Sequence, residues 1–336
     1  MKKMISFLVL LLAMAPNSFA NNISEPIEED TFIGQWGLDI EGGGVGWLNV
    51  HKNKGYLDAE LLWIGGSVVP VGHVYLADEN TLVVTRTHEM KKSKNRSHIM
   101  TFTIRITKTG DEISGTMTGP DRNGKGEMSQ TFTGKRMPAM PDAPDLSQIK
   151  YGKEINLFNG KDLAGWKLMK PDEKSNGFKV VDEQLVNDPV QPKDGEHLSY
   201  GNLRTEQEFE DFNLKLEVNV PKGNNSGVYL RGLYEIQVVD SYGKELDSHN
   251  MGALYSRVTP SEAAEKPAGE WQTFDITLVD RHVTVIFNGK KIIDNQPALG
   301  PTGGAISSDV LAPGPIYLQG DHGNVSYRNI VLTPIL

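Results

Sequence analysis

The chain is built from short segments in which apolar and polar residues alternate. A succession of them fills residues 31–137, from FIGQWGLDI to SQTFTGKR, with clusters of Gly, Asn and Asp between them. Because successive side chains of a strand point to opposite faces, this pattern predicts strands with one buried and one solvated face. The short strands and their close spacing favour a small antiparallel barrel or sandwich.

A second series of alternating segments runs from residue 151 to residue 336. Within it, Asn288-Gly289 separates VTVIF from KKII, and this pair of residues is preferred in two-residue hairpin turns. PSEAAEK, at 260–266, is the one segment that suggests a short helix. We therefore predict a second domain that is also mostly β.

A proline-rich stretch, MPAMPDAPDL at 137–146, lies between the two series. Proline has no backbone N–H to donate and is therefore excluded from the interior of a sheet. We predict a Pro-rich linker over 138–150. The expected fold class is all-β, with a β-rich accessory domain at 31–137 and a β-sandwich at 151–336.

Residues 1–20 have a composition of their own. Lys2 and Lys3 precede the apolar run ISFLVLLLAMA, and Ser18-Phe19-Ala20 follows it. This order predicts a signal peptide that is cleaved after Ala20, and the apolar run is short for a membrane span. We expect an exported protein, periplasmic or secreted, with no membrane anchor after cleavage. An uncleaved anchor is the alternative.

The composition and the absence of several motifs exclude some partners and some classes of chemistry. The net charge is −9 and the only basic run is the short KKSKNR at 91–96, which argues against a nucleic-acid partner. The chain has no Cys, so disulfides, thiolate metal ligands and Cys nucleophiles are excluded. The sequence contains no P-loop, H-E-x-x-H or G-x-S-x-G motif. We name no cofactor, and a divalent cation held by carboxylate and backbone oxygens is left open.

The segment NNSGVYLRGLYEIQVVDS, residues 224–241, has an unusual polar face. Its even positions from Val228 are apolar, whereas its odd positions carry Tyr229, Arg231, Glu235 and Gln237. The polar face of an antiparallel strand is usually only solvated. Rings, amides and charged groups on one face are also the groups that bind a sugar, because a ring packs on its C–H face while polar groups bind its hydroxyls.

Other segments offer residues of the same kinds. IYLQGDHG places Tyr317 and Gln319 on one face of a strand, with His322 at the end of that strand. Trp271 begins the strand-like segment WQTFDITL, and ALYSR contributes Tyr255. Asp240 lies at the end of the segment 224–241, where a rigid scaffold meets a loop that can carry function.

Several motifs occur in an order that resembles a known family. They are LFNGKDLAGWK (157–167), EFEDFNLKLE (208–217), NNSGVYLRG (224–232), YEIQVVDS (234–241), KPAGEWQTFDI (266–276), FNGKKIID (287–294) and IYLQGDHGNVSYRNI (316–330). Together they resemble the 3-keto-disaccharide hydrolase family over residues 151–336. The resemblance implies a concanavalin-like jelly roll, a sandwich of two antiparallel sheets, in which the polar face lines a concave sugar groove.

The resemblance also implies an activity, the hydrolysis of glycosidic bonds in 3-keto-glycosides or 3-keto-disaccharides. A ketone at C3 acidifies the C2–H, so a base can form an enolate, the glycosidic oxygen can leave from C1, and water can then add. This route differs from that of glycosidases that use two carboxylates and an oxocarbenium-like transition state. It requires a base, an acid for the leaving group and donors around the enolate oxygen.

These needs single out a set of residues. The catalytic candidates are Glu235, His322 and Asp240, and which of them is base and which is acid is open. The candidates for substrate binding are Arg231 and Lys266 at the enolate, Asn225, Gln237 and Gln319 at hydroxyls, and Tyr229, Tyr255 and Trp271 as stacking walls. A carboxylate among them is also the candidate ligand of a divalent cation.

Each assignment has a plainer alternative. In these alternatives, Glu235 and Arg231 form only an ion pair across the face, His322 is only a surface loop residue, and Trp271 only belongs to the core. For the whole protein, the alternative is a non-catalytic carbohydrate-binding module of the same fold, because fold does not dictate function.

Overall fold

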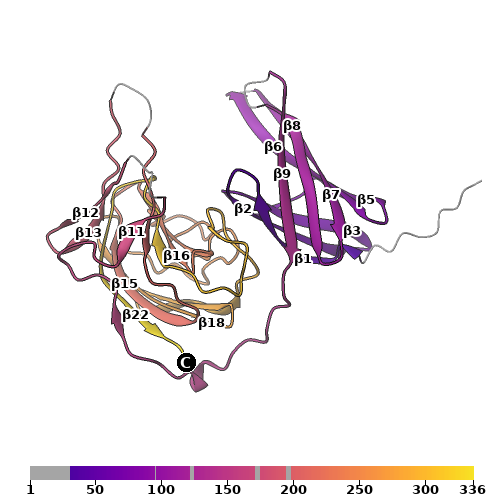
Figure 1. Ribbon diagram of the computed structural model, residues 1–336. Helices are drawn as coiled ribbons and strands as arrows, with labels where there is room; N and C mark the ends of the chain where they lie inside the picture. The colour runs from indigo at the N-terminus through magenta and orange to yellow at the C-terminus, as the bar shows by residue number, and fades with distance from the viewer. Residues whose placement is uncertain (1–30, 95, 122–124, 171–174, 194–197) are drawn as a thin grey trace, which may run out of the picture.

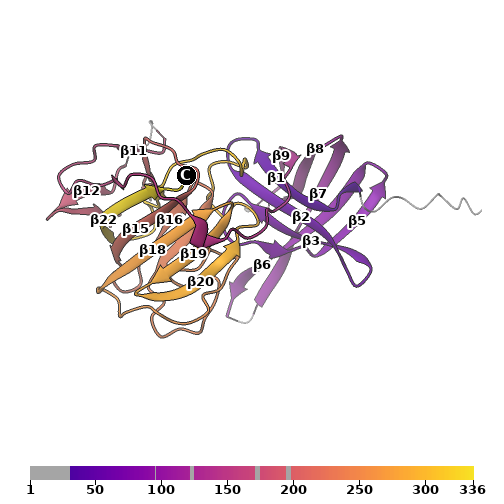
Figure 2. The ribbon, with the colours of Figure 1, turned by 90° about the horizontal axis from the view of Figure 1, so that it is seen from below.

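The computed structural model describes residues 31–336 apart from residue 95 and residues 122–124, 171–174 and 194–197. The predicted signal peptide, residues 1–20, lies outside this part of the chain. The described residues form two β-structures joined by an extended segment, as Figures 1 and 2 show. The all-β fold class that the alternation predicts is confirmed.

The N-terminal domain is one antiparallel sheet of nine strands in the order β4-β3-β2-β1-β9-β8-β7-β6-β5. The strands are β1 (Gly34–Ile40), β2 (Val45–Asn53), β3 (Tyr56–Trp63), β4 (Val69–Pro70), β5 (His73–Asp78), β6 (Thr81–Ser93), β7 (Arg96–Thr109), β8 (Glu112–Pro120) and β9 (Glu127–Arg136). Its core joins strands that lie far apart in this order, because Trp36 of β1, Leu61 of β3 and Leu82 of β6 belong to one buried cluster. A single sheet encloses a core only by curling on itself, which agrees with the barrel alternative.

The C-terminal domain consists of two antiparallel sheets packed face to face. The larger sheet has eight strands in the order β12-β13-β22-β15-β18-β19-β20, with β10 added beside β22, and the smaller has five in the order β11-β14-β21-β16-β17. Leu214 and Ile276 of the larger sheet share one buried cluster with Val228 and Ile236 of the smaller sheet. The apolar sides of the alternating strands therefore face each other across the sandwich, as predicted.

The bounds of these strands follow in chain order. They are β10 (Ile155–Asn156), β11 (Trp166–Leu168), β12 (Phe178–Val181), β13 (Gln184–Asn187), β14 (Leu203–Thr205), β15 (Phe212–Asn219), β16 (Asn225–Leu230), β17 (Tyr234–Val239), β18 (Trp271–Val279), β19 (His282–Phe287), β20 (Lys290–Pro297), β21 (Tyr317–Leu318) and β22 (Val325–Pro334).

Two local predictions have opposite outcomes. Asn288 and Gly289 connect β19 to β20 with φ angles of 48° and 82°, the left-handed values that a tight hairpin turn needs, so the predicted hairpin is confirmed. The helix expected at 260–266 is wrong, since this segment has no helical turn. The N–H of Ser261 donates instead to the carbonyl of Ile292 at 2.8 Å, which ties the segment to β20.

The Pro-rich segment after β9 lies against the sandwich. The Arg281 guanidinium donates to the carbonyls of Pro138 and Ala139 at 3.3 and 3.1 Å, and the Asn295 amide donates to the carbonyl of Pro144 at 2.9 Å. One 3-10 turn, η2 (Leu146–Gln148), follows. The segment thus joins neither sheet as a strand, and it is anchored to the second domain.

A small apolar cluster lies where the two domains meet. Trp47 and Leu62 of the N-terminal domain pack there with Met137 and with Val310 of the sandwich. Trp36 and Trp63 belong to the core of the barrel, whereas Trp47 belongs to this separate cluster. Trp47 lies beneath the guanidinium of Arg257, whose central carbon is 4.2 Å from the ring centroid. The domains therefore share a packed junction.

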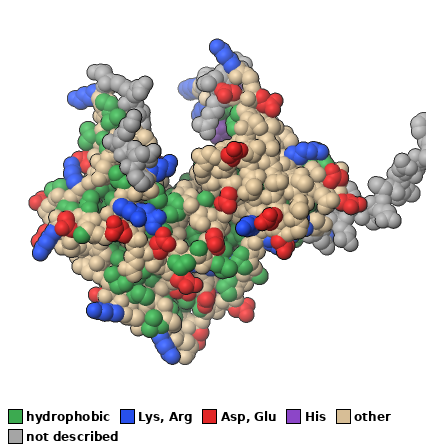
Figure 3. Space-filling model, in the orientation of Figure 1, with side chains coloured by type: hydrophobic (Ala, Val, Ile, Leu, Met, Phe, Trp, Pro, Cys, Tyr) green, Lys and Arg blue, Asp and Glu red, His purple; other side chains and the backbone are tan. Residues whose placement is uncertain are grey.

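The surface of both domains carries charges of both signs (Figure 3). Acidic and basic side chains are interspersed over both domains on the face shown in Figure 3. In the part of the chain that the structure describes, no helix has the length and apolar character needed to cross a membrane.

The sandwich core makes a quantitative prediction. Ile276 on β18 is fully buried, so Ile276→Ala leaves a cavity and is expected to lower the free energy of unfolding by about 3 kcal/mol. Val181 on β12 is 41% exposed, and Val181→Ala is expected to cost less than about 0.5 kcal/mol. Urea unfolding of both variants measures the difference, and equal costs would contradict this placement of the core.

Candidate functional site

The polar face predicted for residues 224–241 exists on the outer side of the five-stranded sheet. Tyr229 on β16 lies opposite Glu235 on β17 and opposite Tyr317 on β21, and Gly227 lies opposite Gln237. The alternation of side chains then places these residues on one face, turned away from the apolar core. The predicted grouping of Tyr229, Glu235 and Gln237 is therefore real.

This face is buried and does not form the open groove that the resemblance implies. Tyr229 is 1% exposed, Glu235 4% and Gln237 5%. One covering segment, residues 247–258, extends the sheet beyond β17: the N–H of Tyr255 donates to the Glu235 carbonyl at 2.9 Å, and the N–H of Gly252 donates to the Gln237 carbonyl at 2.8 Å. Wetting of the face is thus excluded as its explanation.

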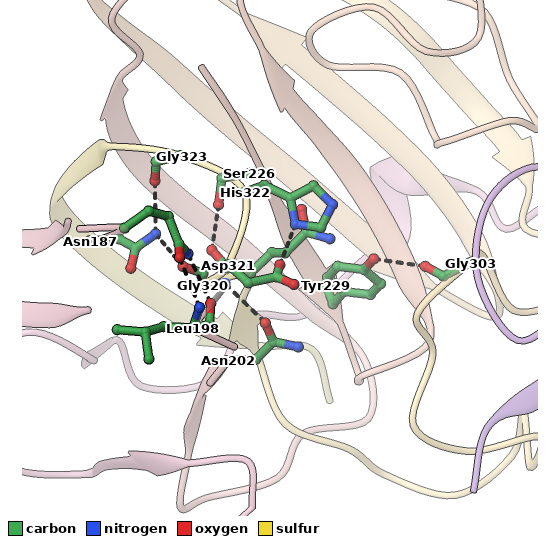
Figure 4. Close-up of polar contacts among 12 residues, drawn as sticks. Asn187, Leu198, Asn202, Ser226, Tyr229, Gly303, Gly320, Asp321, His322 and Gly323 are labelled. Carbon is green, nitrogen blue, oxygen red and sulfur yellow. Dashed lines mark hydrogen bonds and ion pairs between the residues drawn. The ribbon is translucent and has the colours of Figure 1, made fainter. Parts of the chain in front are cut away.

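A second covering segment, residues 300–312, crosses the same face. The Thr302 hydroxyl accepts the N–H of Glu235 at 2.9 Å and donates to the Leu233 carbonyl at 3.1 Å. The carbonyl of Gly303 accepts the Tyr229 hydroxyl at 2.7 Å, and the carbonyl of Gly304 accepts the Tyr317 hydroxyl at 2.6 Å. Figure 4 shows Tyr229 pointing toward Gly303.

The two tyrosines form a stacked pair. Their ring centroids are 3.8 Å apart and the ring planes differ by 14°. Burial holds the pKa of both phenols well above the ordinary value, so they stay neutral at physiological pH. The close approach also requires glycine at 304, where φ is +84° and a Cβ would lie 2.7 Å from the Tyr229 hydroxyl. The pair forms a rigid wall beside Glu235.

The carboxyl of Glu235 occupies space that a glycine leaves free. A Cβ on Gly227 would lie 2.3 Å from Glu235 Oε1, so the carboxyl rests over the bare Cα of the neighbouring strand. Loss of hydration on burial raises the pKa of Glu235 from 4.5 to about 8, although the neighbouring Tyr229 hydroxyl and the charge of His322 both lower it. Glu235 is therefore largely protonated at neutral pH and titrates near it.

His322 lies at the rim of the site, in the loop between β21 and β22. Asn187 fixes this loop from below, because its amide donates to the carbonyls of Gly320 and Gly323, both at 2.9 Å. Asp321 pairs with His322, and this interaction raises the pKa of His322 above its ordinary value of 6.5. Figure 4 shows the loop carrying Asp321 and His322 beside Tyr229.

Two amides on the same face keep free acceptors. Asn225 begins β16, and Gln319 follows β21, where its N–H donates to the Gly227 carbonyl at 3.0 Å. The side-chain oxygens of both are buried without a hydrogen-bond partner in the described structure. Such oxygens are costly to bury unless a ligand or water satisfies them. Exposure rises from Glu235 toward His322, whose side chain is 44% exposed, so a ligand would reach Glu235 from this side.

Four predicted residues do not join this group. Arg231 lies in the β16–β17 turn with φ +55°, and its guanidinium donates to the carbonyls of Val310 and Ala312 at 2.9 and 3.2 Å, so its charge holds a loop and not an enolate. Asp240 accepts the N–H of Gly223 at 2.8 Å and closes the turn before β16. The structure therefore places neither Arg231 nor Asp240 at the Glu235 carboxyl, contrary to the prediction.

Lys266 and Trp271 belong to the other sheet. Trp271 pairs with Asn219 on the eight-stranded sheet, and the guanidinium of Arg328 lies 3.9 Å above its ring. The Lys266 ammonium donates to the Trp271 carbonyl at 3.0 Å. Their adjacency in the motif KPAGEWQTFDI therefore places them together, but not at the Glu235 carboxyl.

The structure adds residues that the sequence analysis did not assign to the site. Tyr317 stacks on Tyr229, and Thr302, Gly303 and Asn187 bind the strands and loops around it. Only the alternation in IYLQGDHG pointed to Tyr317. The remaining three act through loops, whose path no periodic pattern reveals.

A hollow of about 960 Å³ lies on the outer side of β7, β8 and β9. Its carboxylates, Asp39 and Glu41, are exposed and hydrogen-bonded to Ser308 and Thr131, so we do not place acid–base chemistry there. Among the described residues, no three His, Asp or Glu side chains gather as metal ligands would.

The raised pKa of Glu235 predicts how stability depends on pH. The folded protein holds the Glu235 proton up to about pH 8, whereas the unfolded chain loses it near pH 4.5. The contribution of this protonated carboxyl to the free energy of unfolding is therefore complete below pH 4.5 and is lost as the pH rises toward 8. Relative to Glu235→Gln, wild-type stability should fall by roughly 1.4 kcal/mol per pH unit within this window. Urea unfolding of both proteins from pH 4 to 9 measures the difference, and parallel curves would refute the shift.

Comparisons with known proteins complete the description. Residues 153–333 match the model of the 3-keto-alpha-glucoside-1,2-lyase-like domain. Among curated proteins, none matches the chain.

Solved structures offer more distant similarities. A candidate glycosyl hydrolase from Parabacteroides distasonis is 28% identical, with 58% of this chain and 93% of that chain covered and a TM-score of 0.43. A second candidate glycosyl hydrolase from the same organism is 22% identical, with 54% and 93% covered and a TM-score of 0.43. The kappa-carrageenase of Pseudoalteromonas carrageenovora is 8% identical, with 59% and 100% covered and a TM-score of 0.36.

The family match spans most of the sandwich and includes the three strands that carry the Glu235 face, β16, β17 and β21. The motifs that suggested the resemblance lie within it. This match identifies the protein as a glycoside hydrolase-like enzyme. The chain belongs to the family of the 3-keto-alpha-glucoside-1,2-lyase-like domain.

Proposed function

We propose that the protein cleaves the glycosidic bond of 3-keto-glycosides, including 3-keto-disaccharides, at the Glu235 face. The observation that carries the proposal is a single buried carboxyl whose pKa lies near 8, next to a histidine at the rim and two unsatisfied amide oxygens. Groups that titrate near the working pH are suited to proton transfer. The family description, a 1,2-lyase acting on a 3-keto-glucoside, supports a reaction across C1 and C2.

The reaction balances without a redox partner. A base takes the proton from C2, and the C–H electrons form an enolate whose charge rests on the C3 oxygen. The enolate then reforms the ketone, the C1–O bond breaks, and the leaving oxygen takes a proton. Addition of water across C1 and C2 of the enone gives the free 3-keto sugar, so the net change is hydrolysis.

Glu235 is suited to the role of base. Its carboxylate, once formed, is a stronger base than an exposed one because its pKa is about 8. A carboxyl that is mostly protonated at neutral pH is poorly suited to be the nucleophile of an ordinary glycosidase, which must be ionised. The stacked Tyr229 and Tyr317 limit where a sugar ring can lie beside it.

His322 is suited to be the acid and the positive charge near the enolate. Asp321 raises the pKa of His322, which keeps its proton available close to neutral pH. Arg231 and Lys266, expected at the enolate, are engaged elsewhere, so the imidazolium is left to supply this charge. Asn225 and Gln319 would accept sugar hydroxyls with their free oxygens.

The signal peptide expected at residues 1–20 adds a location to the proposal. Export would bring the enzyme to glycosides that have been oxidised at C3 outside the cytoplasm, and cleavage after Ala20 would leave no anchor. The substrate is then the only partner that the proposal requires.

The function is tested by comparing a 3-keto-disaccharide with its unoxidised parent. We expect release of free sugar only from the keto compound, and a loss of about 10²- to 10⁴-fold in kcat/KM for Glu235→Gln. Lys266→Ala is the matched control and should retain activity, because its ammonium binds the carbonyl of Trp271. Saturable binding of the parent without turnover of either sugar would favour the carbohydrate-binding module instead.

The pH profile separates the two proton-transfer groups. The limb of kcat/KM that rises with pH should report ionisation of Glu235 with an apparent pKa near 8. Because the charge of His322 lowers the pKa of Glu235, His322→Asn should move this limb to higher pH as well as reduce the rate. A limb that does not move, or moves to lower pH, would contradict the coupling between the two residues.

A further inference from the structure

We infer that the N-terminal domain is part of the candidate site, because it holds in place both segments that cover Glu235. Four residues after β3 make the contacts: Ile64, Gly66, Ser67 and Val68, here called the docking residues. They reach residues 300–304 on one side and residues 248–256 on the other. The docking itself is independent of the reaction, whereas its consequence for catalysis rests on the proposed function.

The first contact joins the backbones of the two domains. The N–H of Gly304 donates to the carbonyl of Ile64 at 3.0 Å. A Cβ on Gly303 would lie 2.2 Å from the carbonyl oxygen of Gly66, so the chains touch only because residue 303 has no side chain. Gly303 and Gly304 are also the acceptors for the hydroxyls of Tyr229 and Tyr317. The docking residues therefore fix the carbonyls that orient the tyrosine pair.

The second contact fixes the other covering segment. Ser67 Oγ lies 2.7 Å from His249 Nε2, and the N–H of Val68 donates to the Ser256 hydroxyl at 2.8 Å. Tyr255 lies between these two points, with its ring edge-on to His249 at 4.9 Å between centroids. Its N–H donates to the carbonyl of Glu235. Tyr255 therefore links the segment held by Ser67 and Val68 to Glu235 through one main-chain hydrogen bond.

The apolar junction keeps these contacts in register. Arg257 lies over Trp47 of β2 and donates to the Pro301 carbonyl at 2.6 Å, which links the start of the 300–312 segment to the barrel. A Cβ on Gly300 would lie 2.4 Å from Trp47 Nε1. The ribbon of the N-terminal domain is visible beside Gly303 in Figure 4.

Ser67, His249 and Asp247 have the connectivity of a hydrolase triad, but a simpler role fits them. Asp247 also accepts the main-chain N–H of His249 at 2.8 Å, as in a local Asx turn. The side chains of Asp247 and His249 are 60% and 42% exposed, whereas the carboxylate of a triad is buried. We therefore assign the Ser67–His249 contact to docking.

Docking has a consequence for the chemistry of Glu235. Exclusion of water is the largest cause of its raised pKa, and the covering segments exclude that water. The groups whose charges couple to Glu235 are His322 and the phenols of Tyr229, Tyr317 and Tyr327. Gly303 and Ser67 carry no charge. A change in the titration of Glu235 after Ser67→Ala would therefore report water entering the site, whereas Gly303→Ala also disturbs the acceptor of the Tyr229 hydroxyl.

The test uses the full-length protein and two variants, Gly303→Ala and the milder Ser67→Ala. Hydrogen–deuterium exchange within residues 249–256 and 301–305 should rise about five- to tenfold, the effect of losing one hydrogen bond. On the keto substrate, kcat should fall by about ten- to a hundredfold as the site loosens. The rising limb of the pH profile should move to lower pH. Gly152→Ala is the control, since its new Cβ would meet atoms no closer than 3.4 Å and should change none of these.

The outcomes separate docking from function. Wild-type exchange and a wild-type pH profile in both variants would overturn the inference, and Ser67→Ala alone decides the matter if Gly303→Ala fails to fold. Faster exchange in both covering segments supports docking even where the wild-type protein leaves 3-keto-glycosides intact, in which case only the proposed function fails.

Discussion

A carboxyl group removed from water must either keep its proton or find a compensating charge, and the surroundings of Glu235 are organised around that constraint. The side chain lies over Gly227, where any larger residue would collide with Oε1. Its own N–H is bound by Thr302, its carbonyl by Tyr255, and stacked phenols close one side. Among the described residues, only His322 brings a positive charge to bear on it, so the carboxyl titrates near neutral pH.

The supports of this burial come from parts of the chain that are far apart in sequence. The sandwich supplies the floor through β16, β17 and β21, while two long connections supply the cover. Each connection is bound in turn by the N-terminal domain, through the backbone at Ile64 and the hydroxyl of Ser67. An accessory domain that packs in this way acts on the site without touching the substrate, since it limits how far the cover can open.

Part of this arrangement is encoded locally and could be predicted. Alternation placed Tyr229, Glu235 and Gln237 on one face, and Asn288-Gly289 marked a hairpin, because side-chain direction and turn conformation depend on a few adjacent residues. The cover over that face could not be predicted, since it depends on the path of loops. Arg231 shows the same limit. The alternation assigns it to this face, but β16 ends at Leu230 and the Arg231 guanidinium binds the carbonyls of Val310 and Ala312. Trp271 is adjacent to useful residues in sequence, yet sheet membership, which a local pattern does not specify, places it elsewhere.

The burial of Glu235 also bears on the kind of bond cleavage that the site favours. Hydrolysis through an oxocarbenium-like state needs one carboxylate that is ionised at neutral pH beside one that is not. Here the carboxyl nearest the tyrosine wall holds its proton until about pH 8, and the ionisable partner that faces it is an imidazole at the rim. Such a pair is better matched to moving a proton from carbon and returning one to oxygen than to stabilising a cation at C1. In the reaction proposed above, a ketone at C3 would supply the acidity that this chemistry needs, so the substrate would contribute what the second carboxylate contributes in ordinary glycosidases.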